Sequence, residues 1–121
     1  MFSVKTQAIE AFLEAARNTF PNEFIGMLAG NKKTKTVEEL VVVPAIFGET
    51  FSQVYFHMLP LDESIIGTCH SHPSFSNRPS PQDVHTFSKT GMIHFIACRP
   101  YSMESVRAFD QRGKEIPVKI I

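Results

Sequence analysis

The chain has 121 residues, of which 43% are hydrophobic and 20% charged, as in an ordinary globular domain. Lysine plus arginine equals aspartate plus glutamate at 12 each, so no net charge favours nucleic acid or an anionic membrane as a partner. No apolar run is long enough to span a bilayer, and the N-terminus lacks a signal-peptide pattern. We therefore expect one cytoplasmic domain over residues 1–121, with no nucleic-acid or membrane partner.

The first half of the chain predicts a helix followed by a β-hairpin. Apolar residues recur at helical spacing over residues 6–20, and Pro21-Asn22 ends the helix. Glycine and polar turn residues separate the apolar runs that come next. The elements expected there are a strand at 24–28, a turn at 31–35, a strand at 37–45, a loop to Ser52, a strand at 53–58 and a turn at 59–64.

The second half predicts a strand–helix–strand crossover and a final pair of strands. Residues 65–70 and 92–98 should be parallel strands, with the second, the most apolar, at the centre of the sheet. Ser80-Pro81-Gln82-Asp83 is a strong helix start, for a helix that runs to about Lys89. Two strands, at 102–110 and 115–120, should follow around a turn. The whole predicts an α/β domain on a single mixed sheet, antiparallel apart from the crossover, with a helix on each face.

The two cysteines, Cys69 and Cys98, are too few for a disulfide scaffold. Both lie in apolar, strand-like runs, which favours buried, reduced thiols. Because these strands should be neighbours, a bridge between the two cysteines stays open as the alternative.

His70, His72 and Asp83 have the spacing of a metal centre. The histidines are two residues apart at the end of a strand, so both imidazoles face the same side. Asp83 lies in the first turn of the following helix, near the carboxyl end of that strand. His-x-His alone is a weak indication, and Ser80-x-x-Asp83 alone is a capping box. Together they supply two imidazoles, a carboxylate and an open position for water, which predicts one catalytic zinc.

A zinc-bound water needs a proton acceptor, and Glu23 is the best candidate. It stands at the start of the strand predicted at 24–28. The alternative is a solvated residue in the turn between helix and strand. Gly26 and Gly30 indicate close approach of another backbone, although Gly30 also suits a turn.

In these motifs the chain resembles the JAMM/MPN+ zinc metalloproteases, and most closely their small stand-alone archaeal and prokaryotic members. The residues that carry the resemblance are His70-x-His72-x(7)-Ser80-x-x-Asp83 and, upstream, Pro21-x-Glu23-x-x-Gly26-x-Leu28-x-Gly30. The resemblance covers essentially the whole chain. It implies an MPN (JAMM) fold, similar to the cytidine-deaminase-like architecture. It also implies that His70, His72 and Asp83 hold zinc, that Glu23 is the general acid/base and that Ser80 donates a hydrogen bond to the oxyanion.

The implied substrate is the isopeptide or peptide bond after the C-terminus of a ubiquitin-like modifier, as for a desampylase or deubiquitinase. The implied partners are β-grasp modifiers with their C-terminal tails, and their conjugates; a homodimer is left open. Residues 89–91 lead straight into the next strand, so the inserted loop that gives some relatives linkage selectivity is nearly absent.

Candidate substrate contacts lie in two segments beside the predicted centre. Phe47, Val54 and Phe56 belong to a stretch that either walls an added substrate strand or packs in the core, with even odds. Asn77 and Arg78 lie in the loop after the histidines and either touch substrate or face solvent.

The sequence also bears on two other classes of function. A nucleotide deaminase needs His-x-Glu and Pro-Cys-x-x-Cys, and the chain has neither. A catalytically silent MPN module that binds ubiquitin-like tails or scaffolds a complex stays as the alternative. Of the other histidines, His57 and His94 should be packed, and His85 should lie on another helix face.

Overall fold

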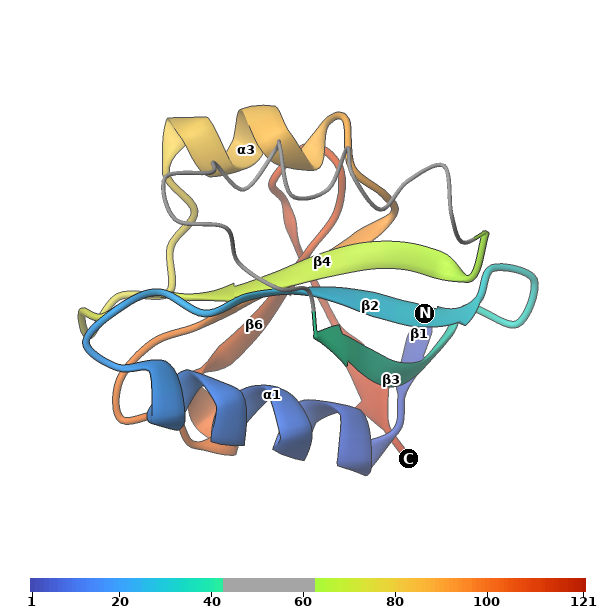
Figure 1. The fold of residues 1–121 in the computed structure, drawn as a ribbon. Coiled ribbons are helices and arrows are strands. Elements are labelled where there is room, and N and C mark those ends of the chain that lie inside the picture. The colour runs from blue at the N-terminus through green and yellow to red at the C-terminus, as the bar shows by residue number, and fades with distance from the viewer. Residues whose placement is uncertain (43–62) are drawn as a thin grey trace.

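The computed structural model describes residues 1–42 and 63–121 of the chain. Within them, eight strands form one mixed sheet in the order β7-β6-β5-β4-β2-β3-β1-β8. Helices α1 and α3 lie on opposite faces of this sheet (Figure 1), which confirms the predicted architecture. The elements are β1 (Phe2–Val4), α1 (Thr6–Thr19), β2 (Ile25–Asn31), β3 (Thr36–Val42), β4 (Ile65–Ser71), α3 (Pro81–Phe87), β5 (Ile93–Ala97), the 3₁₀ helix η2 (Met103–Ser105), β6 (Val106–Phe109), β7 (Glu115–Ile116) and β8 (Val118–Ile120).

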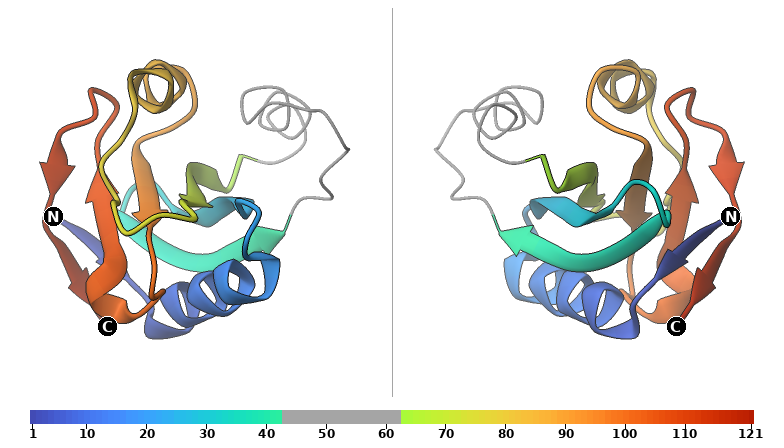
Figure 2. Two further views of the ribbon diagram at one scale, coloured as in Figure 1. Left: turned by 90° about the vertical axis from the view of Figure 1, so that its left-hand side faces the viewer. Right: turned by 90° about the vertical axis from the view of Figure 1, so that its right-hand side faces the viewer.

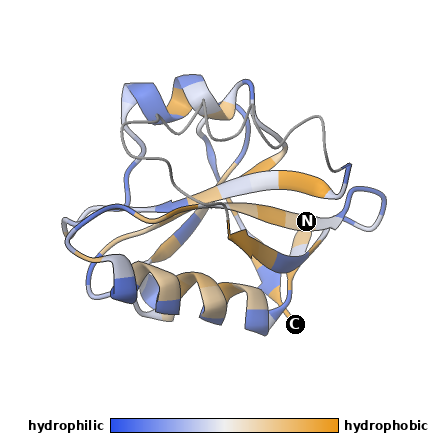
Figure 3. Cartoon of the chain, in the orientation of Figure 1, coloured by the Kyte–Doolittle hydropathy of each residue, from blue (hydrophilic) through white to orange (hydrophobic). Residues whose placement is uncertain are grey.

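Helix α1 is held on the sheet by one apolar face. Its buried residues are Ala8, Ile9, Phe12, Leu13 and Ala16, and polar colours gather on its outward side in Figure 3. The helix ends at Thr19, and Pro21 follows, which cannot continue the backbone hydrogen bonds of a helix. Phe20 is the last residue of the apolar pattern that predicts this helix. It is 41% exposed and not part of the buried face, because it is the C-cap and lies beyond the last helical turn.

Strands β2 and β3 form the predicted hairpin. They pair antiparallel around a turn in which Asn31 Oδ1 accepts hydrogen bonds from the backbone N–H groups of Lys33 and Thr34. A side chain at Gly30 would collide with the backbone carbonyl of Thr36, so this glycine does serve a close approach. The predicted strand at 53–58, its flanking loop and most of the turn at 59–64 lie outside the described residues.

The crossover between β4 and β5 brings two buried strands side by side. They pair parallel, with Gly67 opposite Ile93 and Ser71 opposite Ala97, as predicted. Every residue of both strands is buried, as expected where helices cover both faces of a sheet. Helix α3 begins where predicted and ends at Phe87, two residues early. Strand β5 lies inside the sheet but not at its centre, because two strands lie on one side of it and five on the other.

The ends of the chain depart from the prediction. The strand expected at 115–120 is divided at Pro117 into β7, which pairs with β6, and β8, which pairs with β1 at the other edge of the sheet. The sheet is therefore strongly curved, so that its two edge strands, β7 and β8, are joined directly by Pro117 (Figure 2). Strand β1 was not predicted, and it pairs parallel with β3 and β8. The expectation that all pairing outside the crossover is antiparallel is wrong for these two pairs.

Candidate metal centre

His70 and His72 come together at the carboxyl end of β4. Their Nε2 atoms lie 3.2 Å apart, with His70 buried and His72 half-buried. The Nδ1 atom of His72 lies 3.0 Å from the carbonyl oxygen of Ser76. Because a carbonyl can only accept, this Nδ1 carries a proton, and in the neutral ring Nε2 is left with a lone pair directed at His70.

Helix α3 brings Asp83 to the same point. Its Oδ1 atom lies 3.3 Å from Nε2 of His70, and its Oδ2 atom lies 3.3 Å from Nε2 of His72. A capping box fixes this first turn: Asp83 N–H donates to Ser80 Oγ at 3.1 Å, and Ser80 N–H donates to Asp83 Oδ2 at 2.9 Å. The local sequence that starts the helix thus also aims the carboxylate.

The charges in this cluster favour a bound cation. Burial raises the pKa of Asp83, but hydrogen bonds from His70 and His72 outweigh it, and the net pKa lies well below its usual range. The hydrogen bond to Asp83 raises the pKa of His72, although burial acts the other way. An ionised carboxylate that faces two imidazole nitrogens is therefore stabilised by positive charge, whether a proton or a metal ion supplies it.

The donor set fits one zinc ion. The three separations between donor atoms of His70, His72 and Asp83 are 3.2, 3.3 and 3.3 Å. Ligand atoms about 2.0–2.1 Å from a tetrahedral zinc are about 3.3–3.4 Å apart. Two imidazoles and one carboxylate are also a ligand set of catalytic rather than closed structural zinc sites.

Glu23 approaches the histidines from the segment between α1 and β2. It is exposed, and a carboxylate oxygen of Glu23 and nitrogen atoms of both histidines all lie within 4.8 Å of one another. Two hydrogen bonds fix the next residue: Phe24 N–H donates to Ser71 Oγ at 2.8 Å, and Ser71 N–H donates to Phe24 O at 2.9 Å. Glu23 is thus tied to the strand that carries the histidines.

Two residues that support the cluster were not singled out from the sequence. Ser71 is fully buried and joins β4 to the Glu23 segment through its hydroxyl. The hydroxyl of Tyr101, in the loop after β5, donates to the carbonyl oxygen of His72 at 3.1 Å. Ser71 sits between the two histidines and so had to point to the opposite side. No sequence signal marked Tyr101, whose contact spans 29 residues.

The other candidate residues lie in varied surroundings. The side chain of Asn77 donates to the carbonyl of Ser105 at 3.0 Å and so anchors its own loop, and Arg78 is exposed. Phe47, Val54 and Phe56 lie outside the described residues, as does His57. Ser80 is exposed at the rim of the cluster.

His94 is packed, as predicted. Its ring stacks on Phe87 with centroids 4.3 Å apart, while its nitrogens contact the hydroxyl of Thr68 at 2.6 Å and the carbonyl of Gly91 at 3.2 Å. The carbonyl requires a proton on Nε2, so Nδ1 accepts from Thr68 and the ring is neutral. Burial lowers the pKa of His94 to about 4. His85 is exposed on α3.

The cysteines are both buried and both free. Cys69 pairs with Phe95 of the neighbouring parallel strand, and Phe95 lies three residues before Cys98 in the sequence. Burial raises the pKa of the Cys69 thiol. The structure therefore has two buried, reduced thiols, as the sequence favoured, and no disulfide joins Cys69 to Cys98.

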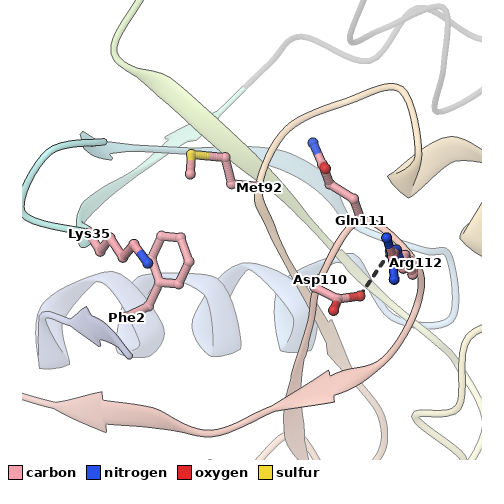
Figure 4. Close-up of a pocket in the computed structure, with 6 residues that line it drawn as sticks. All are labelled: Phe2, Lys35, Met92, Asp110, Gln111 and Arg112. Carbon is pink, nitrogen blue, oxygen red and sulfur yellow. Dashed lines mark hydrogen bonds between the residues drawn. The ribbon is translucent and has the colours of Figure 1, made fainter.

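A separate hollow lies toward the opposite end of the sheet. It has a volume of about 310 Å³ and is lined by Phe2, Lys35, Met92, Asp110, Gln111 and Arg112 (Figure 4). Met92 precedes the amino end of β5, whereas the histidine cluster lies at the carboxyl end of β4. Asp110 Oδ1 accepts from the backbone N–H of Arg112 at 2.8 Å, so it serves the local turn. This hollow contains none of the predicted site residues.

Comparison with known proteins defines the class. The family described as prokaryotic homologs of the JAB domain matches residues 5–110 of the chain. The chain therefore belongs to this family of JAMM/MPN proteins.

Individual relatives of the chain are consistent with this family assignment. A probable metalloprotease of Haloferax volcanii is 32% identical over 120 residues, which cover 92% of this chain and 74% of the relative. A JAB1/MPN domain protein from Archaeoglobus fulgidus superposes with a TM-score of 0.77 at 30% identity, covering 100% of this chain and 97% of the other. A structure described as JAMM, a metalloprotease-like zinc site in the proteasome and signalosome, gives 0.79 at 30% identity, covering 100% and 98%.

No helix within residues 1–42 and 63–121 has the length and hydropathy that crossing a membrane requires.

Proposed function

We propose that the chain is a zinc-dependent peptidase or isopeptidase that hydrolyses the bond after the C-terminus of a ubiquitin-like modifier. One observation carries the proposal: Asp83 lies 3.3 Å from both His70 and His72, and the carboxylate of Glu23 lies within 4.8 Å of both histidines. Membership in the JAMM/MPN family and likeness to a probable metalloprotease support the same activity.

The protein's role at the metal is to hold it with one face open. His70, His72 and Asp83 would be the ligands of a zinc ion, which when bound supplies a Lewis acid and a water molecule of lowered pKa. The carbonyl of Ser76 holds His72 in the tautomer that ligation needs. The capping box of α3 holds Asp83 in place.

Glu23 is proposed to move the proton. Its carboxylate approaches the two histidines from the segment between α1 and β2 and is not one of the three proposed ligands, so it is free to accept a proton from the attacking water. The same carboxyl group then passes that proton to the departing amine. Glu23 is exposed, so water and substrate can reach its carboxylate.

Ser80 is proposed to stabilise the oxyanion. Its Oγ accepts a hydrogen bond from Asp83 N–H, and its hydroxyl proton is not used by any described residue. That proton is available for a developing negative charge on the substrate carbonyl. Capping the helix and donating to the oxyanion are compatible, since one uses a lone pair of the hydroxyl and the other its hydrogen.

The substrate assignment rests on the family resemblance. A modifier tail would approach as an extended strand, with Phe47, Val54 and Phe56 as its proposed wall and Arg78 as a proposed contact beside the histidine loop. Asn77 would act indirectly, by fixing the conformation of this loop, because its side-chain amide already donates a hydrogen bond to the carbonyl of Ser105.

A panel of ubiquitin-like modifiers fused through their C-terminal residue to a reporter tests the proposal. We expect cleavage directly after the modifier, loss of cleavage with a chelator and recovery when zinc is added back. A pure, zinc-loaded protein that binds modifier tails and cleaves no fusion would instead indicate a binding module.

A further inference from the structure

A patch of aromatic rings and arginines lies directly beside the candidate active site. Three segments meet there: the end of α1, the loop after His72 and the loop after β5, all at the same end of the sheet (Figure 1). They enclose a hollow of about 460 Å³, lined by Arg17, Phe20, Phe75, Arg99, Pro100 and Tyr101. We call these six residues the Arg–Phe patch.

The guanidinium of Arg99 lies over the rings of two exposed phenylalanines. Its Cζ atom lies 4.7 Å from the ring centre of Phe20 and 4.6 Å from that of Phe75. Phe20 is 41% exposed and Phe75 is 72% exposed. Exposed apolar side chains that gather around a cation form a candidate binding surface.

Contact with the two rings leaves Arg99 able to bind a carboxylate. Its guanidinium carries its N–H groups in a planar fork, which a carboxylate can bind in bidentate fashion. Among residues 1–42 and 63–121, no carboxylate pairs with Arg99 and no acceptor takes its side-chain hydrogens. Arg17 adds a second positive charge and donates to the carbonyl of Tyr101 at 2.7 Å. None of the six lining residues is acidic.

The patch is continuous with the residues that would do the chemistry. Tyr101 contacts the carbonyl of His72, and the backbone N–H of Arg99 donates to the carbonyl of Ser74 at 2.9 Å. Phe20 lies three residues before Glu23. Burial raises the pKa of Tyr101, Arg99 opposes that shift, and the negative charge of Glu23 adds to it, so both charges lie near the phenol. If Glu23 hands a proton to the leaving amine, that amine lies within hydrogen-bonding reach of Glu23. The segment that carries the amine then leaves the site on the side of the patch.

We propose that the Arg–Phe patch binds an acidic side chain, next to an apolar one, in the target segment on the leaving-amine side of the scissile bond. The inference rests on the proposed function, because it uses the role of Glu23. It makes Arg99, Phe20 and Phe75 determinants of target preference rather than catalytic residues.

Charge reversal tests this preference. Paired fusion substrates carry Glu-Phe or Gln-Phe shortly after the scissile bond, and a third carries Lys-Phe. Wild type should favour the Glu substrate over the Gln substrate roughly fivefold, through KM rather than kcat, as expected for a partly exposed charge pair. Arg99→Glu should reverse the order and favour Lys. Phe75→Ala, at an exposed position, should raise KM for all three substrates, since each contains Phe.

Arg112→Glu is the matched control, because it makes the same change of charge at an exposed position in the turn before β7. It should leave the preference of wild type unchanged. Equal zinc content and equal Tm in all variants exclude a folding defect. A wild type that treats the Glu and Gln substrates alike, or an Arg112→Glu variant that shifts the preference as much as Arg99→Glu, overturns the inference.

A binding measurement separates this inference from the proposed function. Free Glu-Phe and Gln-Phe target peptides are titrated into zinc-loaded protein while NMR follows the Arg99 Nε–H signal. Tighter binding of the Glu peptide, lost in Arg99→Glu, supports the patch even if no fusion is cleaved. Equal binding of the two peptides would overturn the inference. Selective binding of a hexathymidine oligonucleotide would also overturn it, and so would a sedimentation result showing that a second copy of the chain covers the patch.

Discussion

At the scale of single residues, the account depends on three donors that meet within 3.3 Å of one another at the end of β4. Their identities were predictable, because period-two spacing in a strand and a helix N-cap both fix where side chains point. The neighbours that hold them, Ser71 and Tyr101, were not predictable. Their contacts join segments 47 and 29 residues apart, which no local pattern encodes.

Removing one proposed ligand should remove the metal. His72→Ala leaves one imidazole and one carboxylate, too few protein ligands for a catalytic zinc, so we expect zinc to fall from about one equivalent to well below half. His85→Ala is the matched control, an exposed histidine on α3 near the site. Elemental analysis of purified proteins measures the difference, and similar losses in both variants would contradict the assignment of His72.

His94 should make the metal-free protein sensitive to acid. Its folded pKa of about 4 lies below the ordinary 6.5, because burial disfavours the charged ring. Its contribution to stability is therefore complete above pH 6.5 and is lost as the pH falls toward 4, by up to about 3 kcal/mol. The raised pKa of His72 has the opposite effect, since it favours the folded state as the pH falls. The effect of His94 is therefore measured by comparing wild type with a variant at this position.

Urea unfolding at several pH values measures this effect in the presence of a chelator. The free energy of unfolding of wild type should decline between pH 6.5 and 4, and His94→Gln should flatten that decline. His85→Gln should leave it in place. A decline that is equally steep in His94→Gln would show that another group causes it.

At the scale of elements, the site depends on two junctions, the capped start of α3 and the link between β2 and β4. Sequence reasoning found α3 because Ser80, Pro81 and Asp83 form a complete local start signal. It overran the end of the helix because no glycine or proline stands at Ser88 or Lys89. It missed β1, a strand of three residues that is too short to show a period and exists through its pairing with β3 and β8.

The link between β2 and β4 should matter for both stability and rate. Ser71→Ala leaves the buried N–H of Phe24 without its partner, at a cost of about 1–3 kcal/mol in free energy of unfolding. The same change frees the segment that aims Glu23, so kcat should fall by roughly tenfold or more while zinc content stays the same.

Ser88→Ala is the control for this change. Its hydroxyl donates to a helix carbonyl at the exposed end of α3, and its loss should change stability by no more than about 0.5 kcal/mol. Denaturant titration, zinc analysis and single-turnover cleavage give the three readouts. A Ser71→Ala variant with the kcat of wild type would show that this hydrogen bond does not position Glu23.

At the scale of the whole molecule, the sheet brings distant parts of the chain together around the site. Glu23 comes from the first quarter of the sequence and Asp83 from the last third, and β2 and β4 lie side by side between them. The curled sheet, with β7 and β8 at opposite edges joined through Pro117, could not be predicted from sequence. It depends on pairing between the two ends of the chain, where the segments are only two or three residues long.

Zinc should stabilise the whole fold, because its proposed ligands come from both β4 and α3. An ion that binds the folded state alone adds about 2.7 kcal/mol at a hundredfold excess over its Kd, which raises Tm by several degrees. Thermal unfolding with chelator and with zinc measures this shift. We expect it to vanish in His72→Ala and to persist in His85→Ala; a shift of the same size in His72→Ala would place the zinc elsewhere.

The most direct measurement compares the cleavage of a modifier fusion by wild type and by Glu23→Gln, each loaded with one equivalent of zinc. Loss of general acid/base help costs about 10²–10⁴-fold. The account predicts that Glu23→Gln keeps its zinc and loses activity by about that factor, whereas wild type cleaves and stops when the metal is chelated. A Glu23→Gln variant that cleaves as fast as wild type, or a zinc-loaded wild type that cleaves no modifier fusion, would contradict it.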